Sequence, residues 1–213
     1  MSIGPTRILI DWGGTLVRDE LLFDTIALKS GANNPTYDGP HSWDSIRSIG
    51  NQNFFQTLEK SFFKNATFYP NALNVISKYC GANGRASLSE TYIVYDNRPE
   101  LKLTKEQATF QIAKSISDSS AKVNGFYLES NKLSIAKQIG CTMAIEDDPR
   151  IALSYANSGI KVVLLLRKWN RLFDKDTLKL YVPEQKVSNL LDNIYLAEDW
   201  IEADALIKAS ISQ

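Results

Sequence analysis

Short apolar runs alternate with amphipathic stretches along this chain, and each run has the length of a buried strand. The predicted strands cover residues 7–12, 91–96, 125–130, 142–147 and 161–166. The predicted helices cover about 71–80, 104–118, 131–139 and 149–158. Strands that alternate with helices favour an α/β fold, with a doubly wound parallel sheet covered by helices on both faces.

One long stretch, residues 18–70, interrupts this alternation. It is rich in aromatic and polar residues and holds no convincing strand, so we expect a small, mostly helical cap inserted after the first strand. The predicted core is then formed by residues 1–17 and 71–213, and the cap lies over the end of the sheet where Asp11 points. Within the core, the tail at 183–213 is predicted to be a closing amphipathic helix that packs on the sheet.

Charge and composition narrow the class of partner. The chain has 213 residues, with 24 basic and 24 acidic side chains, so it lacks the overall positive field on which nucleic-acid polymer binding rests. No apolar run reaches the ~18 residues of a membrane span, and we predict no membrane partner. The two cysteines, Cys80 and Cys141, are predicted to be buried free thiols, as suits a cytoplasmic protein. We therefore expect a small molecule as the partner.

Acidic residues follow several of the predicted strands. The segment "ILIDWGGTLV" places Asp11 at the end of the first strand, and Asp147 ends another. Parallel strands bring such residues to one edge of the sheet, where two carboxylates repel each other unless a cation lies between them. Oxygen ligands suit Mg²⁺, and a nearby lysine with backbone N–H groups of "GGT" can hold an anion. This set describes a phosphoryl-transfer site with an aspartate nucleophile.

Several separate segments carry a family resemblance. "ILIDWGGTLV" resembles the first motif of the haloacid dehalogenase superfamily, and "NKLSIAKQIGCTMAIEDDPR" resembles its third and fourth motifs. Four segments, "FYPNALNVISKY", "YIVYDNRPE", "AIEDDPR" and "LLLRKWNR", together resemble the 5'-nucleotidase and deoxyribonucleotidase branch. The resemblance implies a Mg²⁺-dependent hydrolase that acts on a small phosphorylated metabolite through an aspartyl-phosphate.

The resemblance also implies the residues that hold the metal. Asp11 matches the nucleophile that forms the aspartyl-phosphate and binds Mg²⁺. The backbone carbonyl of Gly13 matches the second metal ligand. Asp147 matches the acidic ligand of motif four, with Glu146 beside it acting directly or through water.

A second group of residues matches the part of the family site that binds phosphate. Lys132 matches the motif-three lysine, with Lys137 as a second candidate farther along the same helix. The hydroxyl of Thr15 and the amide of Gly14 are expected to shape the phosphate-binding loop.

Two positions depart from the family pattern. Gly13 stands where the phosphatases have a second aspartate, which protonates the leaving oxygen and later activates water. Asp96, or the neighbouring Tyr95, stands where motif two has a serine or threonine that donates a hydrogen bond to phosphate. A carboxylate at position 96 needs a partner beside a phosphate, for which Arg98 is a candidate, and Asn97 is the candidate for the missing donor.

The missing second aspartate leaves alternatives open. General acid–base catalysis contributes about 10²–10⁴-fold, and an ester whose leaving group is stable as an anion needs it least. Asp96 and Glu146 are the candidates for activating water in its place. One alternative is a hydrolase of C–P bonds that resembles the phosphonoacetaldehyde hydrolases and uses a cap lysine, for which Lys29, Lys60 and Lys64 are available. The other is a catalytically silent relative that binds a phosphorylated ligand or a protein.

Overall fold

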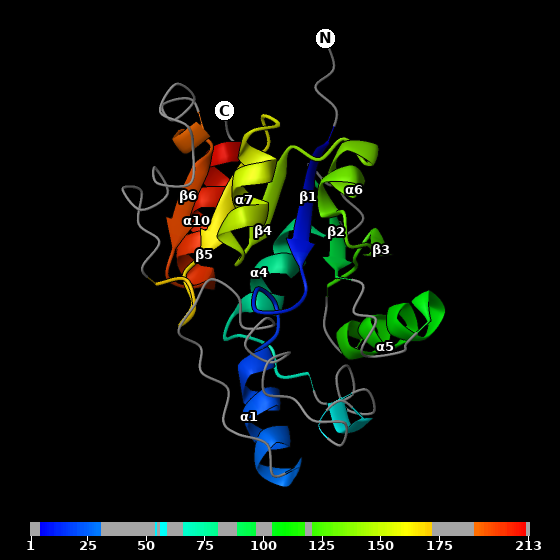
Figure 1. The fold of residues 1–213 in the computed structure, drawn as a ribbon. Helices are drawn as coiled ribbons and strands as arrows, with labels where there is room; N and C mark the ends of the chain where they lie inside the picture. Colours follow the sequence, from blue (N-terminus) through cyan, green and yellow to red (C-terminus); the bar gives the residue numbers. More distant parts are fainter. Residues whose placement is uncertain are drawn as a thin grey trace.

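A computed structural model describes residues 5–30, 54, 56–58, 66–80, 89–96, 104–117, 121–171 and 190–211. Within these residues six parallel strands form one sheet in the order β3-β2-β1-β4-β5-β6 (Figure 1). The strands are β1 (Thr6–Asp11), β2 (Ser89–Tyr95), β3 (Gly125–Leu128), β4 (Met143–Glu146), β5 (Lys161–Leu165) and β6 (Ile194–Ala197). The predicted doubly wound parallel sheet is confirmed.

Burial explains why the central strands are uniformly apolar. Ile8, Leu9 and Ile10 of β1 are all buried, and every residue of β4 is buried as well. A strand covered by helices on both faces has no polar side, so it shows a continuous apolar run and no alternation. The five strands predicted from such runs are confirmed, with ends that differ by one or two residues.

The closing helix predicted at 183–213 is wrong over Ile194–Ala197, where the chain forms strand β6, and residues 183–189 lie outside the described part of the chain. This strand has four residues and lies at an edge of the sheet, pairing Leu196 with Leu164 of β5. Two of its residues are only partly buried, so the apolar run is too weak to stand out. After it, the Asp199 side chain accepts hydrogen bonds from the N–H groups of Ile201 and Glu202, and α10 (Trp200–Ile211) begins there.

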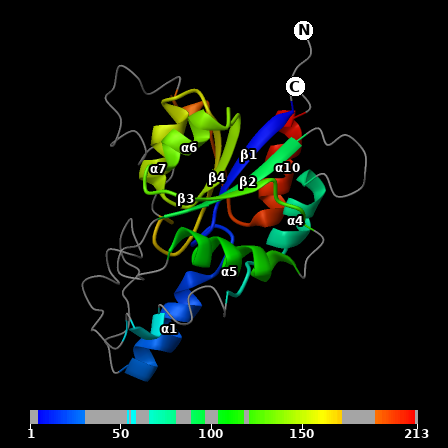
Figure 2. The same ribbon diagram turned by 90° about the vertical axis from the view of Figure 1, so that its right-hand side faces the viewer.

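Helices cover both faces of the sheet, as Figure 2 shows. Ile8 and Ile10 point into a core shared with α4 (Ala72–Tyr79), α5 (Lys105–Ser117) and α10. Leu9 points to the other face, into a core shared with α6 (Lys132–Gln138) and α7 (Pro149–Ala156). Because side chains alternate along a strand, the face reached by Leu9 is also the face available to Asp11.

The segment that follows β1 leaves the sheet, and residues 67–69 pair with residues 16–18. Val17 forms an antiparallel bridge with Phe68, the Arg18 N–H donates to the Thr67 carbonyl (2.7 Å), and the Tyr69 N–H donates to the Leu16 carbonyl (3.1 Å). Helix α1 (Asp19–Ser30) extends from this end of the sheet (Figure 1). The limits of the cap at 18–70 stay a prediction, because most of residues 31–65 lie outside the described part of the chain.

Two further expectations concern side chains and membranes. Cys80 and Cys141 are both buried free thiols, as predicted, and burial raises the pKa of each. Among the residues that the structure describes, no helix has both the length and the apolar character needed to cross a membrane.

Candidate functional site

The candidate site lies where the strand order reverses, between β1 and β4. Asp11 is the last residue of β1, Glu146 is the last of β4, and Asp147 follows directly. In open α/β sheets this switch point, at the carboxyl ends of the strands, is the position at which ligands bind. The fold therefore gathers three predicted site residues at the place where the architecture leaves room for a ligand.

The three carboxylates form one buried cluster. One oxygen from each of Asp11, Glu146 and Asp147 lies within 4.8 Å of the others, and all three side chains are buried. Lys132, the first residue of α6, reaches into this cluster from the face that Asp11 shares with Leu9. Its Nζ donates to Asp11 Oδ1 at 2.7 Å and to Glu146 Oε2 at 3.3 Å. Lys137, the second candidate lysine, is exposed, so of the two lysines it is Lys132 that reaches the acidic cluster.

The pKa directions show how strongly these charges interact. Burial, and then the negative charge of Asp11, raise the pKa of Asp147 to about 7 and raise that of Glu146 well above its usual range. Burial alone lowers the pKa of Lys132, but the charges of Asp11 and Glu146 outweigh it and raise this pKa well above its usual value. Lys132 is therefore a fixed positive charge in the site.

The donor set fits a divalent cation. Three carboxylates and one ammonium group carry a formal charge of two negative units in a buried space, which is unfavourable without a counter-ion or added protons. A dication would balance that charge, and carboxylate oxygens are the ligands that Mg²⁺ prefers. Asp11, Glu146 and Asp147 are thus the residues that would hold it.

Asp147 is oriented by residues from two loops. The Thr15 hydroxyl donates to Asp147 Oδ1 and the Trp169 indole N–H donates to Oδ2, each at 2.8 Å. The Asn170 amide donates to the Asp147 carbonyl at 2.7 Å and to the Leu165 carbonyl at 2.9 Å. The loops after β1 and β5 therefore fix both the side chain and the backbone of Asp147.

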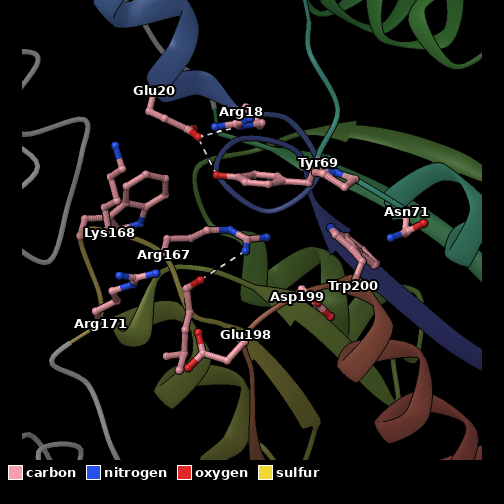
Figure 3. Close-up of a pocket in the computed structure, with 13 residues that line it drawn as sticks. Arg18, Glu20, Tyr69, Asn71, Arg167, Lys168, Arg171, Glu198, Asp199 and Trp200 are labelled. Atoms are coloured by element: carbon pink, nitrogen blue, oxygen red, sulfur yellow. Dashed lines mark hydrogen bonds and ion pairs between the residues drawn. The ribbon is translucent and has the colours of Figure 1, made fainter.

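Arg167 holds the loop after β1, and sequence reasoning did not single it out. The buried guanidinium donates to the carbonyls of Gly14 (2.7 Å) and Thr15 (3.3 Å), and it lies 3.8 Å from the ring centroid of Tyr69. Figure 3 shows this stack, with the Tyr69 hydroxyl directed at Glu20 (3.1 Å). The available signal was a basic residue placed soon after an apolar strand, in "LLLRKWNR".

A cavity of about 380 Å³ opens beside this stack (Figure 3). Arg18, Arg167, Lys168 and Trp169 are among the residues that line it. Trp169 also bonds Asp147, so one side chain connects the cavity wall to the acidic cluster. The three clustered carboxylates are not in the lining of this cavity.

The backbone at Gly14 requires glycine. Its φ is +72°, and a β-carbon there would lie 2.7 Å from Asp147 Cγ and 2.8 Å from the Trp169 ring. The absence of a side chain lets the loop pass close to Asp147. The Gly14 amide donates to the Val17 carbonyl at 3.0 Å, and Thr15 bonds Asp147, so both residues shape the loop. Their contact with phosphate stays a prediction.

The remaining predicted residues are only partly placed. Asp96 directly follows β2, the strand beside β1, and is partly buried at the same edge of the sheet. Asn97 and Arg98 lie outside the described residues, as do the side chains of Lys29, Lys60 and Lys64. The predicted role of the Gly13 carbonyl as a metal ligand stays a prediction.

Comparison with known proteins identifies the fold. No protein-family model and no curated protein matches the sequence. A haloacid dehalogenase-like protein of unknown function from Agrobacterium tumefaciens is 12% identical, with 97% of this chain and 99% of that chain covered and a TM-score of 0.60. A haloacid dehalogenase-like hydrolase from Burkholderia xenovorans is 13% identical, with coverage of 99% and 100% and a TM-score of 0.59.

A third structure, a hydrolase from Pseudomonas syringae, is 14% identical, with coverage of 96% and 98% and a TM-score of 0.54. These likenesses span nearly the whole chain, which therefore has the haloacid dehalogenase-like fold that the sequence motifs suggested. They do not extend to the 5'-nucleotidase branch, which stays a prediction.

Proposed function

We propose that this protein is a Mg²⁺-dependent hydrolase of small phosphate monoesters, with Asp11 as the nucleophile. The observation that carries the proposal is the contact between Asp11 Oδ1 and Lys132 Nζ, 2.7 Å apart, inside a buried cluster with Glu146 and Asp147. Such a cluster costs stability, because it buries more negative than positive charge. Sites that keep such charges are commonly functional, which favours catalysis over a structural role.

The residues divide the work of phosphoryl transfer. Lys132 binds Asp11 Oδ1 at 2.7 Å and orients the carboxylate that attacks phosphorus. Mg²⁺, when bound by Asp11, Glu146 and Asp147, supplies positive charge against the phosphate oxygens. Attack forms an aspartyl-phosphate and releases the alcohol, and water then hydrolyses the aspartyl-phosphate to restore Asp11.

The substrate class follows from the resemblance and from the loop after β1. The motifs that resemble the nucleotidase branch make nucleoside monophosphates the first esters to test. The Gly14 and Thr15 loop, held by Arg167, is the candidate phosphate-binding surface, with Asn97 and Arg98 as further donors. Position 13 brings no carboxylate of its own, so activated esters are expected to react fastest.

A catalytically silent phospho-ligand binder is the second candidate function. Glycine at position 13 and aspartate at position 96 favour it, because both replace residues that assist the reaction in the family that the sequence resembles. Removing the charge of Asp11 separates the two candidates. A binder keeps or gains affinity for a phosphorylated ligand in Asp11→Asn, whereas an enzyme loses its nucleophile.

The test measures hydrolysis of p-nitrophenyl phosphate and a panel of nucleoside monophosphates, with Mg²⁺ and with EDTA. We expect turnover of the activated ester by the wild type with Mg²⁺, and its loss in EDTA and in Asp11→Asn. Equal rates for wild type and Asp11→Asn on every ester would refute the proposal. Affinity for inorganic phosphate that persists in Asp11→Asn, without wild-type turnover, would favour the binder.

A further inference from the structure

A carboxylate fills the space that a side chain at position 13 would occupy. A β-carbon built on Gly13 would overlap Asp19 Oδ2 and would lie 3.4 Å from Asp19 Cγ. Gly13 does not have a positive φ, so its backbone accepts any residue. The group that a side chain at position 13 would meet, and would have to displace, is therefore the Asp19 carboxylate. Asp19 is the first residue of α1 and is only 6% exposed.

The space at position 13 lies on the same side of the backbone as the nucleophile, Asp11. The chain keeps its β pairing just beyond β1, because the Trp12 N–H donates to the Val94 carbonyl at 2.9 Å and Gly13 bridges Val17. Successive residues of an extended chain alternate sides, so a side chain at position 13 would project to the same side as Asp11. Asp19 thus presents its carboxylate on the side of the backbone from which Asp11 reacts.

Hydrogen bonds tie two other carboxylates of the site to the acidic cluster and the loops around it. Glu146 is bound to Lys132, and both oxygens of Asp147 accept hydrogen bonds, from Thr15 and Trp169. Asp19 comes from α1, which extends from the carboxyl end of the sheet (Figure 1). The leaving oxygen lies on the side of the phosphorus that faces away from Asp11, so the acid that protonates it must lie past the carboxyl end of β1. Asp19 belongs to the segment that lies there.

We propose that Asp19 is the proton donor and acceptor of the reaction, because its carboxylate lies where a side chain at position 13 would be. This inference rests on the proposed function. In the first half, Asp11 bonds to phosphorus, the bond to the leaving oxygen breaks, and that oxygen takes the proton of Asp19. In the second half, Asp19 takes a proton from the attacking water, whose oxygen bonds to phosphorus while the Asp11–phosphorus bond breaks. Both carboxyl groups return to their initial states.

Asp19→Asn tests this role, since it keeps the shape and removes the transferable proton. Hydrolysis of p-nitrophenyl phosphate separates the two halves, because p-nitrophenol leaves readily as an anion. We expect a rapid burst of one p-nitrophenol per enzyme, followed by steady turnover about 10²–10⁴-fold slower than in the wild type. With glycerol phosphate, whose leaving oxygen needs the proton, the first half is expected to slow by the same factor.

Asp24→Asn is the matched control, because Asp24 lies on the same helix and its replacement removes the same charge. It is expected to keep both burst and steady rate within about threefold. Wild-type steady turnover in Asp19→Asn, together with loss of the burst in Asp11→Asn, would overturn the Asp19 inference and leave the proposed function standing. An unchanged Asp11→Asn would instead remove the proposed function and the inference with it.

A position exchange keeps the inference testable if Asp19→Asn folds poorly. Asp19→Gly removes the carboxylate that lies at position 13. Adding Gly13→Asp then places one carboxylate near the same point, now carried by residue 13. We expect the double variant to turn over glycerol phosphate at least about tenfold faster than Asp19→Gly alone. An exchange that restores folding, measured by circular dichroism, without restoring turnover would overturn the inference.

Discussion

Replacing Lys132 by methionine removes the only ammonium group found in the described acidic cluster, and it should destabilise the metal-free protein. Lys132 Nζ lies 2.7 Å from Asp11 Oδ1 and 3.3 Å from Glu146 Oε2. At an effective dielectric constant of about 20, unit charges at these distances attract by about 6 and about 5 kcal/mol. Burial of the three charges offsets much of this attraction, so the free energy of unfolding should fall by about 3–5 kcal/mol.

Urea unfolding in EDTA at neutral pH measures this loss. Lys137→Met is the matched control, because Lys137 lies on the same helix with its side chain exposed, and a change below about 0.5 kcal/mol is expected. In an Asp11→Asn background one of the two partners is already neutral, so Lys132→Met should cost about 1–3 kcal/mol less. A loss under about 1 kcal/mol for Lys132→Met alone would show that the clustered carboxylates do not need the ammonium group for stability.

Three further outcomes are expected. Gly14→Ala should lower the free energy of unfolding, measured by urea titration, by about 2–5 kcal/mol, because alanine is strained at a left-handed backbone and its methyl group would meet Asp147 and Trp169. Gly159 has a similar φ of +78° but open space around it, so Gly159→Ala should lower the free energy of unfolding by only about 1–2 kcal/mol. Mg²⁺ at a hundred times its Kd should stabilise the fold by about 2.7 kcal/mol, and Asp147→Asn should abolish most of that gain in thermal unfolding. Burial raises the pKa of Asp204, but hydrogen bonds from lysine and tyrosine side chains outweigh it and lower this pKa to about 2. The stability that the ionised Asp204 contributes is present above about pH 4 and should be lost, by at most about 2 kcal/mol, as the pH drops through about 2. Asp204→Asn should flatten this pH profile of the free energy of unfolding.

The sequence was sufficient to predict the sheet and the acidic end of its central strands. Continuous apolar runs identified β1, β4 and β5, because strands buried on both faces show no polar side. Asp11 and Asp147 end such runs or follow them, so parallel pairing alone was enough to bring them together. The edge strand β6 was missed because it has only four residues, two of them partly buried, which is too little apolar pattern to separate it from the following helix.

Contacts between distant segments were beyond sequence reasoning. The structural role of Arg167 depends on hydrogen bonds from its guanidinium to the carbonyls of Gly14 and Thr15, which lie more than 150 residues away in the sequence. Asp19 reads in the sequence as an ordinary acidic residue at a helix start. Its relation to Gly13 depends on how the chain turns after β1, and no periodicity encodes that turn.

Detection of a phosphorylated aspartate would test most directly whether Asp11 is the nucleophile. The wild type is mixed with p-nitrophenyl phosphate and Mg²⁺, quenched in acid during the first turnover, and digested for peptide mass spectrometry. We expect the peptide containing Asp11 to gain the mass of one phosphoryl group, and Asp11→Asn to show neither this modification nor turnover. Metal-dependent turnover with an unmodified Asp11 peptide, retained in Asp11→Asn, would show that Asp11 is not the nucleophile.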